Sequence, residues 1–269
     1  KITFKNISKI EKETKQYMDL SLSYFFQEVT SDPVMCVTVL LTLGVIFVNG
    51  WTDAPNAIAT CIGTRSMGVR AAILTSAVFN FLGVFIMTHI NSSVASTISN
   101  MVDFGDNTQE ALIALCAALF SIVVYSVVAA RFGIPTSESH SLIAGLSGAA
   151  IAMHNGLEGI NMQEWVKVLY GLVLSLALGF AIGWIFCKII TIICVNVDRR
   201  KANKFFQGAQ IVGAAAMSFM HGAQDGQKFI GVLFLGMAFC NGQSSVFGMT
   251  IPVWLMLLCS VTMGLGTSV

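Results

Sequence analysis

The sequence has few charged residues: only 11% are Asp, Glu, Lys or Arg, whereas 55% are hydrophobic. Soluble domains carry roughly 25% charged residues, so this composition excludes an ordinary soluble fold. The formal net charge is +1, and no basic stripe with interleaved aromatic residues occurs, so nothing favours nucleic acid as a partner. A mean hydropathy of +0.76 indicates a polytopic membrane protein surrounded by the lipid bilayer.

The seven cysteines form no C-x-x-C pair and are scattered through apolar runs, so we interpret them as small apolar side chains. Catalytic signatures are also lacking, because neither H-E-x-x-H nor the nucleophile elbow G-x-S-x-G occurs. The string HGAQDGQKF (221–229) lacks the G-K-[ST] ending of an ATP-binding loop. We therefore expect neither an enzyme nor an ATP-driven pump, and no bound cofactor.

Apolar runs of membrane length divide the chain into predicted helices, since a span needs about 20 residues at 1.5 Å each. They cover Pro33–Gly50, Val69–His89, Glu110–Ala130, Trp165–Val195, Gln207–Met220 continuing through Phe229–Phe239, and Ile251–Gly266. A further segment, 135–153, begins with the polar string PTSESH and then turns small and apolar. That pattern is typical of a half-helix packed inside protein. The predicted fold class is an all-α polytopic membrane protein with discontinuous, re-entrant helices.

Lysine and arginine placement orients the spans in a cell membrane, because basic loops stay on the cytoplasmic side. Arg65, Arg70, Arg131 and the basic run in 199–204 fall in loops that are consistent as cytoplasmic. We expect residues 1–33 to form an amphipathic interfacial segment, helical over 2–28. The remaining units are a first repeat with a connecting helix (34–195), a basic cytoplasmic loop (196–206) and the start of a second repeat (207–269), with more chain expected beyond.

One short frame, G-x-x-D-x-x-[N/K], occurs twice in apolar surroundings. The first copy supplies Gly50, Asp53 and Asn56, and the second, 172 positions later, supplies Gly222, Asp225 and Lys228. A carboxylate inside the membrane costs several kcal/mol unless it is paired, so duplicated aspartates indicate an ion site. With the predicted orientation the two copies enter from opposite sides. Inverted repeats of this kind are typical of secondary transporters, whose sites form where the repeats meet.

Spacing brings the polar residues of each copy together. Asp53 and Asn56 share a helix face, and Pro55 favours a helix break beside them. In the second copy one face holds His221, Asp225 and Lys228. The alternative is that Asp225 and Lys228 only brace two helices as a buried ion pair, which would leave Asp53 unexplained.

The string PTSESH predicts an anion site. Pro135 suits the first turn of a helix, and the free N–H groups and dipole of a helix start favour negative charge. The polar residues that follow are Thr136, Ser137, Glu138, Ser139 and His140. The simplest alternative is an ordinary helix cap. A more distant one is an intramembrane enzyme built on Glu138, His140 and the aspartates.

These motifs resemble those of the inorganic phosphate transporter (PiT) family. The family's strings are G-x-N-D-x-x-N, H-G-A-N-D-A-Q-K and P-x-S-T-T-H; here they read GWTDAPN, HGAQDGQK and PTSESH. The resemblance covers roughly residues 35–269. Thr52 and Gln224 replace asparagines, Glu138 replaces a threonine, and Asn80 stands where many members have a carboxylate.

The resemblance implies secondary active transport of inorganic phosphate by symport with Na⁺ or H⁺; another tetrahedral oxyanion, sulfate above all, is the alternative. We assign the cation to oxygen ligands of Asp53, Asn56, Gln224 and Asp225. Phosphate is assigned to Thr136, Ser137, Ser139, His140 and Lys228. Glu138 and His221 are expected to act in coupling or selectivity, with Glu138 facing the anion. A second copy of the chain, in a homodimer, is a candidate partner.

Overall fold

The computed structural model describes residues 21–91, 93–105, 107–243 and 251–269. Regular structure in these ranges is helical, apart from one isolated β-bridge between Val102 and Ile160. The helices are α2 (Leu22–Ser31), α3 (Pro33–Thr52), α4 (Pro55–Gly63), α5 (Val69–Ile90), α6 (Ser93–Ser99), α7 (Thr108–Arg131), α8 (Glu138–His154), α9 (Met162–Cys194), α10 (Arg199–His221), the π-helical turn η1 (Gly222–Gly226), α11 (Gln227–Cys240) and α12 (Val253–Thr267). The all-α class is thus confirmed.

Polar caps start most of the long helices where the apolar runs begin, because a side-chain oxygen satisfies a free N–H of the first turn. Asp32 accepts from Val34 N at 2.8 Å ahead of α3, and Pro33 occupies the first helical position. The same role falls to Asn107 before α7, Ser137 before α8, Asn161 before α9 and Asp198 before α10. Four segments are long and apolar enough to cross a membrane: Pro33–Gly63, Val69–Ile90, Thr108–Arg131 and Met162–Cys194.

Three predicted segments need comment. Most of the expected helix 2–28 lies outside the described residues, and its last part belongs to α2. The predicted loop 196–206 differs from the structure, because α10 begins at Arg199. Asp198 caps that helix, and the Arg, Lys and Ala residues that follow are strong helix formers. The short helix α6 was not expected from the hydropathy pattern.

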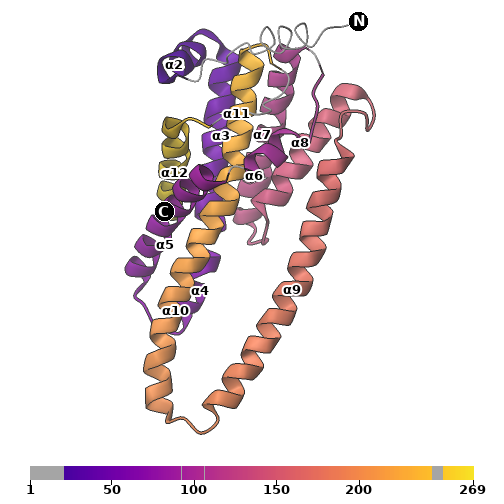
Figure 1. The fold of residues 1–269 in the computed structure, drawn as a ribbon. Coiled ribbons are helices and arrows are strands. Elements are labelled where there is room, and N and C mark those ends of the chain that lie inside the picture. The colour runs from indigo at the N-terminus through magenta and orange to yellow at the C-terminus, as the bar shows by residue number, and fades with distance from the viewer. Residues whose placement is uncertain (1–20, 92, 106, 244–250) are drawn as a thin grey trace, which may run out of the picture.

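Helix α11 occupies the middle of the bundle. Its residues from Gln227 to Phe239, Lys228 apart, are buried, and it packs on α3, α6 and α7. In Figure 1, α3 descends to α4, whereas α10 rises through η1 into α11. The two copies of the repeated frame therefore run in opposite directions, as predicted.

Helix α9 stands apart from the bundle (Figure 1). None of its residues, all of which are described, is buried. Its first turns touch the rest of the molecule through Trp165, whose Nε1 donates to Ser147 Oγ at 3.2 Å. A helix that is apolar all round and exposed suits a lipid surface.

Glycines let the helices of the two repeats approach backbone to backbone. A Cβ added to Gly83 in α5 would lie 2.0 Å from Phe219 O in α10, and one added to Gly222 would lie 2.2 Å from Asn80 O. Neither neighbour is a flexible side chain that could move aside. Close packing here is what holds α5 against the turn that carries Asp225.

Gly83→Ala should therefore destabilise the protein by roughly 1–3 kcal/mol, the range for overpacking a tight core. Gly213→Ala in α10 is the matched control, since a Cβ there meets nothing within 4 Å. Thermal melting of both purified variants in detergent measures the difference. Equal melting temperatures would show that α5 and α10 are not in backbone contact.

Candidate ion site at two broken helices

The first copy of the frame sits at a helix break. Helix α3 ends at Thr52, α4 begins at Pro55, and Asp53 is the cap between them. Two backbone bonds across the break, Asn56 N to Asp53 O and Ala57 N to Ala54 O, both 3.1 Å, span three residues instead of four. Proline lacks an N–H, so the regular ladder cannot continue through it. The predicted break is confirmed, and it places the Asp53 carboxylate inside the bundle.

The second copy sits on the π-helical turn η1, which joins α10 to α11 without a gap. Single π turns occur most often at functional sites. Here the turn carries Asp225, whose Oδ1 lies 2.6 Å from Lys228 Nζ. On the other side Asp225 Oδ2 lies 3.5 Å from His221 Nε2. The predicted common face of His221, Asp225 and Lys228 is confirmed.

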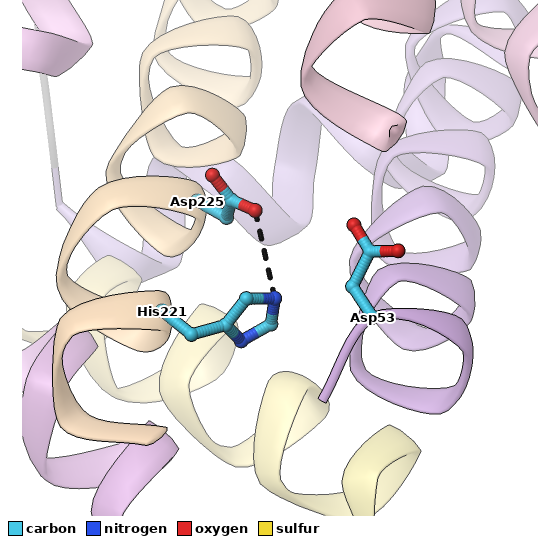
Figure 2. A group of neighbouring side chains, drawn as sticks. All are labelled: Asp53, His221 and Asp225. Carbon is cyan, nitrogen blue, oxygen red and sulfur yellow. Dashed lines mark ion pairs between the residues drawn. The ribbon is translucent and has the colours of Figure 1, made fainter. Parts of the chain in front are cut away.

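The two copies meet at one place. Asp53, His221 and Asp225 offer ligand atoms that all lie within 4.8 Å of one another. Figure 2 shows the Asp53 side chain reaching from α3 toward the other two, which come from the rising helix opposite. This group of three is called the acid–imidazole cluster below. It confirms that the aspartates of the two repeats share one neighbourhood.

Asn49 belongs to this neighbourhood, although the motifs did not single it out. Its Nδ2 donates to Asp53 Oδ2 at 3.2 Å, and its Oδ1 is buried without a hydrogen-bond partner among the described residues. The same repeat offset relates Asn49 to His221, whose Nε2 is also buried and unpaired. The repeat offset was therefore the sequence signal from which Asn49 could have been found. Each copy thus places a polar residue beside its aspartate, one turn earlier in the chain.

The start of α8 lies against both aspartates. Ser139 Oγ donates to Asp225 Oδ1 at 3.0 Å and accepts from Lys228 Nζ at 2.6 Å. Glu138, the first residue of α8, lies near the Asp53 side chain. Free N–H groups at a helix start favour negative charge, so α8 stabilises a carboxylate here.

The Glu138 carboxylate, which the sequence places beside an anion, is held by hydroxyl groups of two neighbouring helices. It is fully buried and accepts from Ser126 Oγ of α7 and, at 3.4 Å, from Thr52 Oγ1 of α3. It lines neither of the two cavities described next. Glu138 therefore ties the start of α8 to α3 and α7. These contacts come from helix packing, which the sequence alone did not reveal.

Two cavities lie at the start of α8, and only the smaller one is lined by a member of the cluster, Asp53. One of about 370 Å³ is lined by Thr52, Asp53, Asn56 and Thr136 among others. The second, of about 790 Å³, lies between α7 and α8. Its polar lining is Ser121, Tyr125, Thr136, Ser137, His140 and Ser141. The predicted anion residues are thus divided: Ser139 faces Asp225, whereas Thr136, Ser137 and His140 face the cavities.

Gln224 is separated from the other predicted cation ligands. It is an exposed residue of η1, and in the described part of the chain no hydrogen bond joins its side chain to the cluster. Asn56 is exposed as well, but it lines the smaller cavity together with Asp53. The structure therefore brings Asp53 and Asp225 together, places Asn56 with Asp53 on the smaller cavity, and leaves Gln224 exposed.

The charges around the cluster do not balance. Asp53 and Asp225 face a single ammonium group, that of Lys228, and Glu138 adds a further carboxyl nearby. Two carboxylates a few ångströms apart repel each other by kcal/mol-scale amounts even at an effective dielectric of about 20. A bound cation would relieve this repulsion, and carboxylate and amide oxygens are suitable ligands for a hard cation.

The fold and the cluster together define a multi-pass membrane protein of the inverted-repeat transporter class, with its polar site where two broken helices meet. The family model described as "Phosphate transporter family" matches residues 49–269. The chain therefore belongs to the phosphate transporter family.

Individual relatives agree with this assignment. A probable low-affinity inorganic phosphate transporter of Bacillus subtilis is 33% identical over 88% of this chain and 70% of its own length. One from Mycobacterium bovis is 31% identical over 87% of this chain, which spans 54% of that protein. Among solved structures, one described as "The sodium-dependent phosphate transporter" matches the fold with a TM-score of 0.77 at 20% identity, over 88% of this chain and 75% of its own.

Removing the ammonium group of Lys228 should lower the stability of the protein, because Asp225 loses its charge partner. Lys228→Met would leave Asp225 without its cation, and we expect about 3 kcal/mol of destabilisation, the scale for breaking a buried pair. The double variant Lys228→Met, Asp225→Asn should recover most of this loss. Lys167→Met is the control, because the Lys167 side chain, which pairs with Glu164, is 63% exposed, whereas that of Lys228 is 19% exposed. Thermal melting of the four proteins tests this; equal losses in Lys228→Met and Lys167→Met would contradict it.

Proposed function

We propose that this protein moves inorganic phosphate across the cell membrane by symport with Na⁺. The observation that carries the proposal is the acid–imidazole cluster, where carboxylates from both repeats lie within 4.8 Å of each other. Such a site is unfavourable when empty and also repels a phosphate dianion. A cation therefore has to enter before or with the anion, and this requirement couples the two.

The cation would be held by Asp53 and Asp225, with Asn56 and the buried Oδ1 of Asn49 as neutral oxygen ligands. Gln224 could join this set only if η1 moved. Na⁺ is favoured over H⁺ because the site offers several oxygens at once, whereas a proton needs only one. The likeness in fold to a sodium-dependent phosphate transporter supports the same choice.

Phosphate would be held beside the cation by Lys228, Ser139 and the hydroxyl-bearing start of α8. Ser139 and Lys228 already bond each other at 2.6 Å, next to Asp225. Thr136, Ser137 and His140 line the route from the larger cavity. The names of the relatives, both probable low-affinity inorganic phosphate transporters, favour phosphate over sulfate.

Uptake of radiolabelled phosphate into proteoliposomes of the full-length protein, with and without a Na⁺ gradient, tests this function. We expect uptake that requires inward Na⁺. Uptake driven only by a proton gradient would replace Na⁺ with H⁺. Sulfate uptake without phosphate uptake would overturn the substrate.

Asp53→Asn and Asp225→Asn should each lower Na⁺-driven uptake by about tenfold or more, because the cation loses a charged ligand while packing is kept. Asp198→Asn is the matched control: it caps α10 away from the cluster, and asparagine caps as well as aspartate. Uptake rates are compared at equal reconstituted protein. If the two aspartates serve only as a brace, uptake per folded protein persists in both variants, although melting temperature falls.

Glu138→Gln should lower the preference for phosphate over sulfate. The amide loses one of the two acceptors for Ser126 and Thr52, so the start of α8 shifts relative to the cluster. The measurement is competition of unlabelled sulfate against labelled phosphate. A ratio equal to that of the unchanged protein would remove Glu138 from selectivity.

A further inference from the structure

A chain of hydrogen bonds runs from α12 through α5 to the imidazole of His221. Thr267 Oγ1 donates to Met263 O at 2.9 Å, and Asn80 Nδ2 donates to Thr267 Oγ1 at 3.0 Å. Asn80 Oδ1 then lies 2.9 Å from His221 Nδ1. Asn80 is fully buried and Thr267 nearly so, which protects the chain from competition by water.

The direction of these bonds fixes the tautomer of the ring. The hydroxyl of Thr267 has one hydrogen, which Met263 O receives, so Thr267 must accept the next bond. The amide nitrogen of Asn80 therefore faces Thr267, and its carbonyl oxygen faces the ring. Since that oxygen can only accept, His221 Nδ1 must carry the hydrogen.

The other ring nitrogen then presents its lone pair to the cluster. His221 Nε2 is buried, has no hydrogen-bond partner among the described residues, and lies 3.5 Å from Asp225 Oδ2. A donating N–H would approach to about 3 Å, so the geometry is that of two acceptors side by side. With Asp53 included, the three members of the cluster present acceptors to one another, and the donors to the two carboxylates come from outside it: Asn49, Ser139 and Lys228.

We propose that Asn80 and Thr267 are positioning residues, which hold His221 with Nδ1–H turned away and the Nε2 lone pair turned toward Asp53 and Asp225. In this tautomer a cation, and not an imidazole N–H, has to satisfy the carboxylates. The reverse tautomer would donate from Nε2 to Asp225 and compete with the cation. The inference rests on the proposed cation symport. It adds that two residues outside the repeated frame, Asn80 and Thr267, keep the site ready to bind the cation.

¹⁵N nuclear magnetic resonance of the histidine rings in the reconstituted full-length protein tests the tautomer directly. The His221→Gln variant identifies the His221 signals among the four histidines. We expect a proton on Nδ1, an unprotonated Nε2, and a shift of the Nε2 resonance when Na⁺ alone is added. An Nε2–H tautomer would overturn the proposal.

Asn80→Leu should remove the acceptor and let the ring adopt the Nε2–H tautomer. We expect the Na⁺ concentration for half-maximal phosphate uptake to rise about tenfold, as for loss of a residue that orients a ligand. Ser76→Ala is the matched control, because Ser76 lies one turn earlier on α5 and bonds Ser218 of α10 at 3.0 Å without touching His221. It should change neither the tautomer nor the Na⁺ dependence.

The outcomes separate this inference from the proposed function. An Nδ1–H ring that responds to Na⁺ and changes in Asn80→Leu supports the positioning role even if phosphate uptake is not found. Equal Na⁺ dependence in Asn80→Leu, Ser76→Ala and the unchanged protein overturns the role even if uptake is normal. If Asn80→Leu does not fold, Thr267→Val replaces it in the test. This variant frees the Asn80 amide and should give a smaller rise in the Na⁺ concentration for half-maximal phosphate uptake.

Discussion

The repulsion between Asp53 and Asp225 inside an apolar bundle is the constraint on which the rest of the structure depends. Two carboxylates this close need donors, and each nearby element supplies one. Helix α3 supplies the amide of Asn49 to Asp53, α8 supplies Ser139 to Asp225, and α11 supplies Lys228 to Asp225. These donors leave negative charge in excess. Among the described residues, the acidic groups of the site therefore outnumber its one ammonium group, that of Lys228.

Much of the architecture could be predicted because the relevant signals are local. Hydropathy located the ends of α3, α5, α7 and α9 to within a few residues, since contact with lipid selects apolar side chains along each span. The meeting of the two aspartates followed from the repeat itself. When a motif with a charged residue occurs twice in apolar sequence, the simplest physical explanation is that the two copies meet at one polar site.

The partners of buried polar groups could not be predicted in the same way. Glu138 was expected to face an anion, yet it bonds Ser126 and Thr52, which are distant in sequence and become neighbours only when α3, α7 and α8 pack. The contact of Asn80 with His221 is of the same kind. The start of α10 was missed for another reason. Its run of basic residues indicated a cytoplasmic loop, but arginine, lysine and alanine favour a helix once Asp198 caps it.

The backbones of the two copies deviate from the α-helix in opposite directions. Around Asp53 the turn is tightened, with bonds across three residues, whereas around Asp225 it is widened into a π turn. A widened turn is equivalent to one inserted residue, so each residue beyond it is rotated by about 100° relative to a regular helix. Losing one residue from 222–224 would leave α10 and α11 helical yet rotate Asp225 and Lys228 together relative to His221. The number of residues in this turn therefore determines how the side chains of the site are placed relative to one another. This number matters as much as which side chains the site contains.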